Sequence, residues 1–176
     1  TPDADARLAA ELLASAKDRA ENIMIVDLLR NDLSRVCRDH TVAVPVLCGL
    51  ESFRTVHHLV SVVTGRLQEG RGAVDLLRAA FPGGSVTGAP KIRAMEIIAE
   101  LEPTRRGPYC GAVAWLGFDG AMDSSIVIRS FTVKGRELRF QAGGGIVADS
   151  DPAAEYDETL AKAAALMAAL GGRLVE

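Results

Sequence analysis

The stretch RELRFQAGGGIVADSDPAAEYDETLAKA, residues 136–163, places a strand signal, a glycine triplet and a helix signal next to one another. Its first residues alternate in polarity, which is typical of a strand. Glycine at the end of a strand marks a bulge or a tight bend, or a place where a ligand approaches the backbone. A helix is predicted from about Asp151, because aspartate can cap a helix and Pro152 is pre-set for the first helical position.

Similar strand signals lie upstream of this stretch. YCGAVAWLGF (109–118) and SSIVIRSFTV (124–133) also alternate, and a KG turn at 134–135 leads into the last strand. Helices are predicted over 4–21, 55–67, 73–81 and 91–102, residues 41–53 are β-like, and residues 23–37 fit either helix or strand. Helices combined with an antiparallel meander indicate an α+β fold. Because such a meander needs a further layer or more strands, we expect the chain to be part of a larger domain.

Composition excludes several classes of protein. The chain has 176 residues, 48% hydrophobic and 24% charged, with a formal net charge of -3, so neither a nucleic acid nor a membrane surface is an expected partner. No apolar run reaches the roughly 18 residues of a membrane span, and we expect no signal peptide. Three widely spaced cysteines without a CxxC pair predict free thiols and a cytoplasmic protein.

Carboxylates occur twice at a spacing of three. Glu155 and Glu158 are predicted to share one face of the last helix, and Asp18 and Glu21 repeat that spacing near the end of the first. One interpretation is a solvated face, with Lys162 as the partner of Glu158. The other is a site for Mg²⁺, which takes oxygen ligands and commonly joins one or two carboxylates to an anionic substrate.

Two glycine-rich segments are candidates for binding an anion. The glycines are Gly143, Gly144 and Gly145, whose main-chain N–H groups could hold a carboxylate; the alternative is a simple bend. GGSVTGAPK (83–91) is not a P-loop, because Ile92 follows the lysine. In this loop Ser85 is a hydroxyl donor, and Lys91 stands in the first turn of a helix without an evident partner.

Three further side chains are candidates for the same site. Arg129, predicted within a strand, needs a carboxylate or water; the alternative is an exposed position on an edge strand. Tyr109 could supply a hydroxyl from a neighbouring strand. Of His57 and His58, one is expected to face inward and one outward, and an inward histidine is more often a satisfied core group than a catalyst. The set predicts a pocket for a small, multiply anionic metabolite.

Four segments resemble the chorismate-binding enzymes, and the likeness covers nearly the whole chain. They are ENIMIVDLLRNDLSRVC, GGSVTGAPKIRAMEIIAELEPTRRGPYCGAV, MDSSIVIRS and QAGGGIVADSDPAAEYDETLAKA. The resemblance implies the β-sandwich with outer helices that is shared by anthranilate-, aminodeoxychorismate- and isochorismate-forming members. Gly144 and Ala161 stand where anthranilate-forming members more usually have alanine and asparagine, so the para-aminobenzoate branch, leading to folate, is the nearer likeness.

The resemblance also implies a role for each candidate. Glu21 and Glu158 match magnesium ligands, and Glu155 matches an acidic neighbour at the metal; Asp18 stands where many members have glutamate. Substrate-binding positions are matched by Ser85, Tyr109, Arg129, Gly143, Gly144 and Gly145. His58 matches a histidine near the departing hydroxyl, and Lys91 matches the lysine of the GAPK loop; both are predicted as catalytic.

The implied reaction is amination of chorismate at C4 to 4-amino-4-deoxychorismate, with ammonia supplied from glutamine by a separate amidotransferase subunit. The alternatives are formation of anthranilate and pyruvate, or a non-catalytic binding or assembly module. Family members carry a PIKGT or PIAGT segment upstream of the region matched here, and this sequence contains neither. We therefore expect residues 1–176 to be the C-terminal portion of a single chorismate-binding domain, and to be inactive alone.

Overall fold

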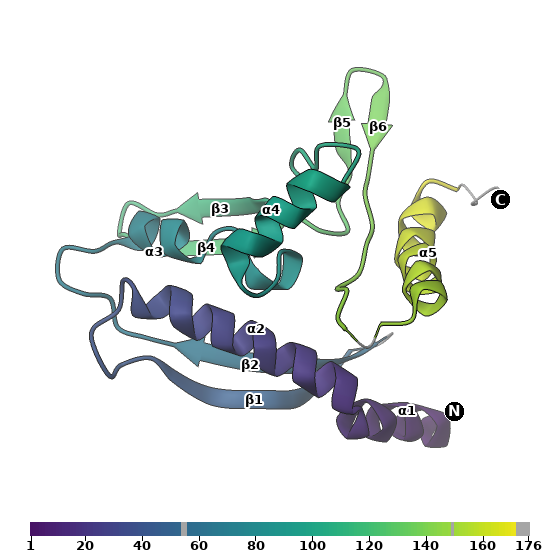
Figure 1. The fold of residues 1–176 in the computed structure, drawn as a ribbon, viewed down its shortest axis with the longest axis horizontal. Helices are drawn as coiled ribbons and strands as arrows, with labels where there is room; N and C mark the ends of the chain where they lie inside the picture. The colour runs from purple at the N-terminus through teal and green to yellow at the C-terminus, as the bar shows by residue number, and fades with distance from the viewer. Residues whose placement is uncertain (54–55, 149, 172–176) are drawn as a thin grey trace. The chain divides into compact units, whose positions relative to one another are not determined.

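The computed structural model describes residues 1–53, 56–148 and 150–171 (Figure 1). It divides into two compact units, Thr1–Met95 and Glu96–Glu176. Helices and strands occur in both units, which confirms the α+β prediction.

Two helices open the first unit where one was predicted. Helix α1 (Pro2–Ala14) and helix α2 (Ala16–Ser34) meet at Ser15, whose extended backbone ends the first helix. The Ser15 hydroxyl then caps α2 by accepting a hydrogen bond from the Asp18 amide at 3.2 Å. Helix α2 also covers most of the stretch at 23–37 that the sequence left undecided.

The predicted helix over 55–67 is wrong. Strand β1 (Ala43–Ser52) pairs antiparallel with strand β2 (His57–Thr64), and residues 54–55 lie outside the described chain. The second half of β2 is rich in branched residues, and these pack well on a pleated surface once a partner strand is present. The pairing has register shifts near Val46, where irregularity bends a strand.

The core of the first unit forms where α2 ends. Leu33, Val36, Cys37 and Ala79 are buried together, and partly buried apolar side chains from the hairpin and neighbouring segments pack around them. Ala79 comes from helix α3 (Ala73–Ala80), as predicted, and a loop with a short 3₁₀ turn, η1 (Gly84–Val86), leads to helix α4 (Lys91–Leu101). The core therefore fixes α3 against α2 and sets the starting point of the glycine-rich loop.

The second unit holds paired strands and the last helix. Strand β3 (Ala112–Leu116) pairs with β4 (Met122–Ile126), and β5 (Thr132–Lys134) pairs with β6 (Glu137–Arg139). Among the described residues these are separate two-stranded sheets, so the predicted meander is wrong: β4 ends at Ile126 instead of continuing toward residue 133. Helix α5 (Pro152–Ala169) begins where predicted, and Asp151 caps it by accepting from the Ala154 amide at 2.9 Å.

Apolar side chains on two helices stay exposed. On α4, Ile92 and Leu101 are 76% and 75% exposed, and α1 buries none of its residues. None of the described helices combines the length and apolar character needed to cross a membrane. All three cysteines are free thiols, two of them buried, as predicted.

Candidate functional site

The glycine triplet lies against the first turns of α5 in the second unit. A β-carbon added at Gly144 would lie 3.3 Å from Glu155 Oε2, 3.7 Å from Glu158 Oε1 and 3.6 Å from Lys162 Nζ. The backbone at Gly144 therefore approaches both predicted carboxylates and the lysine that follows them. The predicted side-by-side placement of Glu155 and Glu158 on one helix face is confirmed by these contacts.

Glu155 is the buried member of the acid pair, with 6% of the residue exposed. Ser150 donates its hydroxyl proton to Glu155 Oε1 at 2.6 Å, and the same hydroxyl accepts from the Val147 amide at 3.0 Å. A carboxylate buried to this degree needs such partners, because desolvation penalises the charge. The sequence reasoning did not single out Ser150; its place just before the Asp151 cap was the available signal.

Glu158 is more exposed and forms an ion pair with Lys162, one helical turn further along α5. This is the partner that the solvated-face interpretation predicted. The pair does not exclude a cation, since an ammonium group held by one exposed carboxylate is a weak competitor in water. Lys162 places a positive charge beside the two carboxylates, and this charge would repel a cation bound there.

The donor set in this unit fits magnesium chemically. Two carboxylates approach the same glycine, and Mg²⁺ is commonly held by one or two protein carboxylates together with water and substrate oxygens. Within the described ranges, no three His, Cys, Asp or Glu side chains gather closely enough to hold a metal by themselves. The arrangement thus suits an open site, in which water and substrate oxygens complete the coordination of the cation, and not a site made of protein ligands alone.

Tyr109 lies beside the same glycine triplet. A β-carbon at Gly143 would lie 3.4 Å from the Tyr109 hydroxyl. The fold therefore brings together Tyr109 and Gly143, two residues that the sequence made candidates for the same site. Burial raises the pKa of Tyr109 above its usual value, and the charge and hydrogen bond of the neighbouring Cys110 add to the rise. The phenol therefore stays protonated and can donate a hydrogen bond across the physiological range.

Arg129 does not lie in a strand, contrary to the prediction. It follows the end of β4 with a backbone φ of 52°, in the left-handed region that is uncommon for residues other than glycine. The side chain is exposed. A left-handed residue cannot continue the extended pairing, which explains why the alternating pattern through residue 133 does not form one long strand.

Besides Lys91, three predicted site residues belong to the first unit. Glu21 is half-buried on α2, and Ser85 is exposed within η1. His58 is exposed on β2, where its ring packs edge-on against Phe53 with centroids 5.8 Å apart. Its neighbour His57 has a side chain only 10% exposed and contacts Asp5 at 3.1 Å, so the predicted alternation of the two histidines is confirmed.

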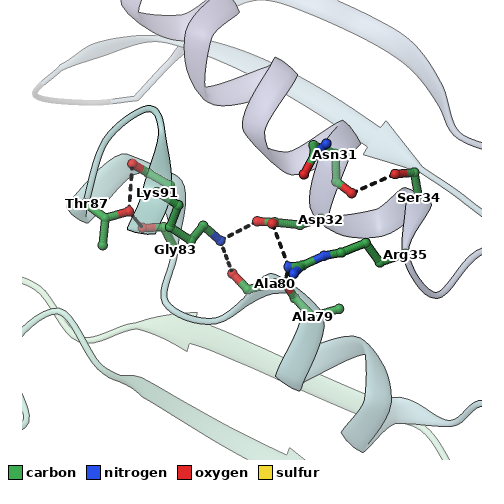
Figure 2. Close-up of polar contacts among 10 residues, drawn as sticks. Asn31, Asp32, Ser34, Arg35, Ala79, Ala80, Gly83, Thr87 and Lys91 are labelled. Atoms are coloured by element: carbon green, nitrogen blue, oxygen red, sulfur yellow. Dashed lines mark hydrogen bonds and ion pairs between the residues drawn. The ribbon is translucent and has the colours of Figure 1, made fainter. Parts of the chain in front are cut away.

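Lys91 has a partner that the sequence reasoning missed. Its ammonium group forms an ion pair with Asp32 and donates to the Ala80 carbonyl at 3.1 Å, as Figure 2 shows. Asp32 is only 5% exposed. The signal was present in the sequence: Leu28, Asp32 and Val36 recur every four residues, which places a carboxylate on the apolar face of a helix.

The chain belongs to the chorismate-binding enzymes, whose family model matches residues 1–168. It is 60% identical over 161 residues to aminodeoxychorismate synthase component 1 of Klebsiella aerogenes, covering 92% of this chain and 36% of that protein. It is 56% identical over 169 residues to anthranilate synthase component 1 of Streptomyces coelicolor, covering 96% of this chain and 33% of that protein.

A solved structure shares the fold. The crystal structure of anthranilate synthase component I from Streptococcus pneumoniae matches with a TM-score of 0.86 and 46% identity, over 93% of this chain and 38% of the other. The predicted relation to the anthranilate synthase-like fold is thereby confirmed. The chain spans about a third of the length of the curated relatives it matches.

Proposed function

We propose that the protein aminates chorismate at C4, giving 4-amino-4-deoxychorismate and water, with ammonia derived from glutamine by a partner amidotransferase. The observation that carries this proposal is the approach of Gly143 and Gly144 to Tyr109, Glu155 and Glu158 within one unit. Together they form an anion-binding backbone, a hydroxyl donor and two carboxylates suited to magnesium. The family model runs through residues 1–168, which supports treating the chain as a portion of one chorismate-binding domain.

Each residue of this arrangement has a distinct proposed role. The amides of the glycine triplet and the Tyr109 hydroxyl would hold and orient substrate carboxylate oxygens. Glu155 and Glu158 would hold Mg²⁺, and Glu21 is a further magnesium candidate by its place in the family motif. Magnesium would supply charge neutralisation and orientation for a carboxylate of the substrate.

Three further side chains have proposed roles toward the substrate. The exposed guanidinium of Arg129 is available for a second carboxylate, and the exposed hydroxyl of Ser85 for a polar substrate group. His58 would orient or protonate the departing C4 hydroxyl, since its ring is exposed while that of His57 is engaged. Ammonia then forms the new C4–N bond, and the C4–O bond breaks with loss of water.

Anthranilate formation is the second candidate, favoured by the 56% identity to an anthranilate synthase component. The two functions differ in product, so the complete protein should be incubated with chorismate, ammonia and magnesium. Fluorescent anthranilate released with pyruvate would contradict the proposal. A non-fluorescent aminated product that yields para-aminobenzoate only after a lyase is added would support it.

A paired variant tests the metal assignment in the same assay. Glu158→Gln is expected to remove magnesium-dependent turnover, whereas Asp157→Asn, on the same helix and exposed, should leave it unchanged. Turnover that persists in Glu158→Gln at wild-type magnesium concentrations would contradict the role of Glu158.

A further inference from the structure

The carboxylate of Asp32 is a buried junction between three segments of the first unit. Arg35 Nη2 donates to Asp32 Oδ1 at 2.9 Å, and the Lys91 ammonium pairs with Oδ2. The two cations also reach the end of α3: Arg35 donates to the Ala79 carbonyl, and Lys91 donates to the Ala80 carbonyl (Figure 2). One aspartate on α2 therefore connects α2, the end of α3 and the start of α4.

The loop between α3 and α4 is held at a second point on the same helix. A β-carbon added at Gly84 would lie 3.0 Å from Leu28 Cδ1 and 3.2 Å from Leu28 Cβ, so the loop backbone rests directly on the Leu28 side chain. Leu28 and Asp32 are four residues apart on α2 and thus lie on one face. The loop is fastened to that face both at Gly84 and at Lys91.

Internal hydrogen bonds stiffen the segment between these two points. The Thr87 hydroxyl donates to the Gly83 carbonyl at 2.9 Å, and the Val86 amide donates to the same carbonyl at 3.2 Å. Ser85 lies within this stiffened turn, and it is exposed. The geometry therefore presents the Ser85 hydroxyl from a backbone that is anchored on both sides.

The surroundings of Lys91 argue against direct recognition of an anionic substrate. Its side chain is 14% exposed, and its charge is neutralised by a carboxylate whose side chain is 7% exposed. If the buried ammonium group paired with a substrate instead of Asp32, it would have no partner whenever the substrate was absent. Leaving a buried charge unpaired in this way is costly, because the charge has been removed from water. The charge that stands unfavourably in the first turn of α4 is instead balanced by Asp32.

We propose that Asp32 is a positioning residue, which through Lys91 fixes the 83–91 loop so that Ser85 meets the substrate in a set orientation. This inference rests on the proposed function, in which Ser85 binds chorismate. It assigns Lys91 to the same positioning pair in place of a catalytic role. The loss of either partner should therefore loosen the loop and weaken substrate binding more than it slows turnover of bound substrate.

The test uses the complete protein with Asp32→Asn, Lys91→Met and the double variant. Asp27→Asn is the matched control, because Asp27 also lies on α2 and pairs with an arginine three residues later, but with 63% of its side chain exposed. Amide hydrogen exchange over 83–88, measured without substrate, should rise about tenfold or more in both single variants. The KM for chorismate should rise about tenfold, with kcat changed less than about threefold.

The double variant separates positioning from stability alone. Removing both charges leaves no unpaired buried ion between these two side chains, so global stability should recover relative to the single variants. The loop anchor is still missing, and we expect loop exchange and KM to stay raised. If the single variants do not fold, the double variant alone decides the question.

Two results would overturn the proposal. The first is a double variant with wild-type loop exchange and wild-type KM. The second is a Lys91→Met variant that loses kcat while its loop exchange and KM are unchanged, which would make Lys91 catalytic. If the wild-type protein turns over no chorismate, the proposed function fails, whereas the hydrogen-exchange comparison still tests the anchor independently.

Discussion

Replacing Lys162 by methionine should tighten magnesium binding, because its ammonium group lies beside the carboxylates that are proposed to hold the ion. Its ammonium group pairs with Glu158, and its Nζ would lie 3.6 Å from a β-carbon at Gly144. A cation held by Glu158 must therefore compete with this ammonium group and also be repelled by it. Methionine keeps most of the length and the apolar stem of the side chain and removes only the charge.

The magnitude follows from the exposure of the pair and from Coulomb's law. The side chains of Lys162 and Glu158 are 27% and 47% exposed, and such an i,i+4 pair contributes about 0.3–0.5 kcal/mol. Repulsion between an ammonium and a divalent ion about 4 Å away amounts to about 2 kcal/mol in water, before screening by salt. With screening, we expect a net gain of about 1.4 kcal/mol, which is roughly a tenfold lower Kd for Mg²⁺.

Calorimetric titration of the complete protein with Mg²⁺, without chorismate and at constant ionic strength, measures this change. Lys134→Met is the control, because it removes the same charge from the exposed end of β5 in the same unit. Glu158→Gln should change affinity in the opposite direction and weaken Mg²⁺ binding. Weaker binding by both Lys162→Met and Glu158→Gln would refute the reasoning, since Lys162 would then support the metal instead of competing with it.

Three further changes test the loop, the phenol and a surface pair. Gly84→Ala should lower the free energy of unfolding by about 1–3 kcal/mol, because the new methyl group meets Leu28 at 3.0 Å; a wild-type urea midpoint would contradict that close packing. Because the pKa of Tyr109 is raised above 10.0, its contribution to stability is full below pH 10 and is lost as pH rises through the folded pKa. Tyr109→Phe should therefore lose less stability than wild type above pH 10, as urea midpoints at pH 8 and 11 would show. Hydrogen bonds from Arg106 lower the pKa of Glu102. The ionised carboxylate therefore stabilises the fold above pH 4.5, and this stabilisation is lost as the pH falls through the folded pKa. Glu102→Gln should make stability depend less on pH in this acidic range, by no more than about 0.5 kcal/mol.

The sequence predicted the helix starts, turns and same-face pairs that depend on residues close together in the chain. The start of α5 follows from the Asp151 cap and Pro152, and the turn between β5 and β6 follows from Gly135, which adopts a φ of 62°. The acid pair on α5 follows from helical spacing. Its proximity to the glycine triplet was also expected, because only a short turn separates the two segments in the chain.

Partners distant in the chain were not predictable from these patterns. Residues 55–67 were predicted as a helix from their own pattern, but the described part of this segment pairs as a strand once β1 offers its backbone groups across the hairpin. Arg129 lies in an alternating pattern that predicted a strand, yet β4 already ends at Ile126 and the backbone at Arg129 is left-handed. For β2 the deciding contact lies outside the short window that a periodic pattern samples.

The 176 residues by themselves determined the family, the helix caps and the order of the motifs, because these are written in contiguous stretches and in short-range backbone preferences. Only the tertiary structure decided that Lys91 faces Asp32, 59 residues earlier in the chain. The physical reason is burial: a charged group withdrawn from water must find its partner in space, and sequence distance places no limit on where that partner lies.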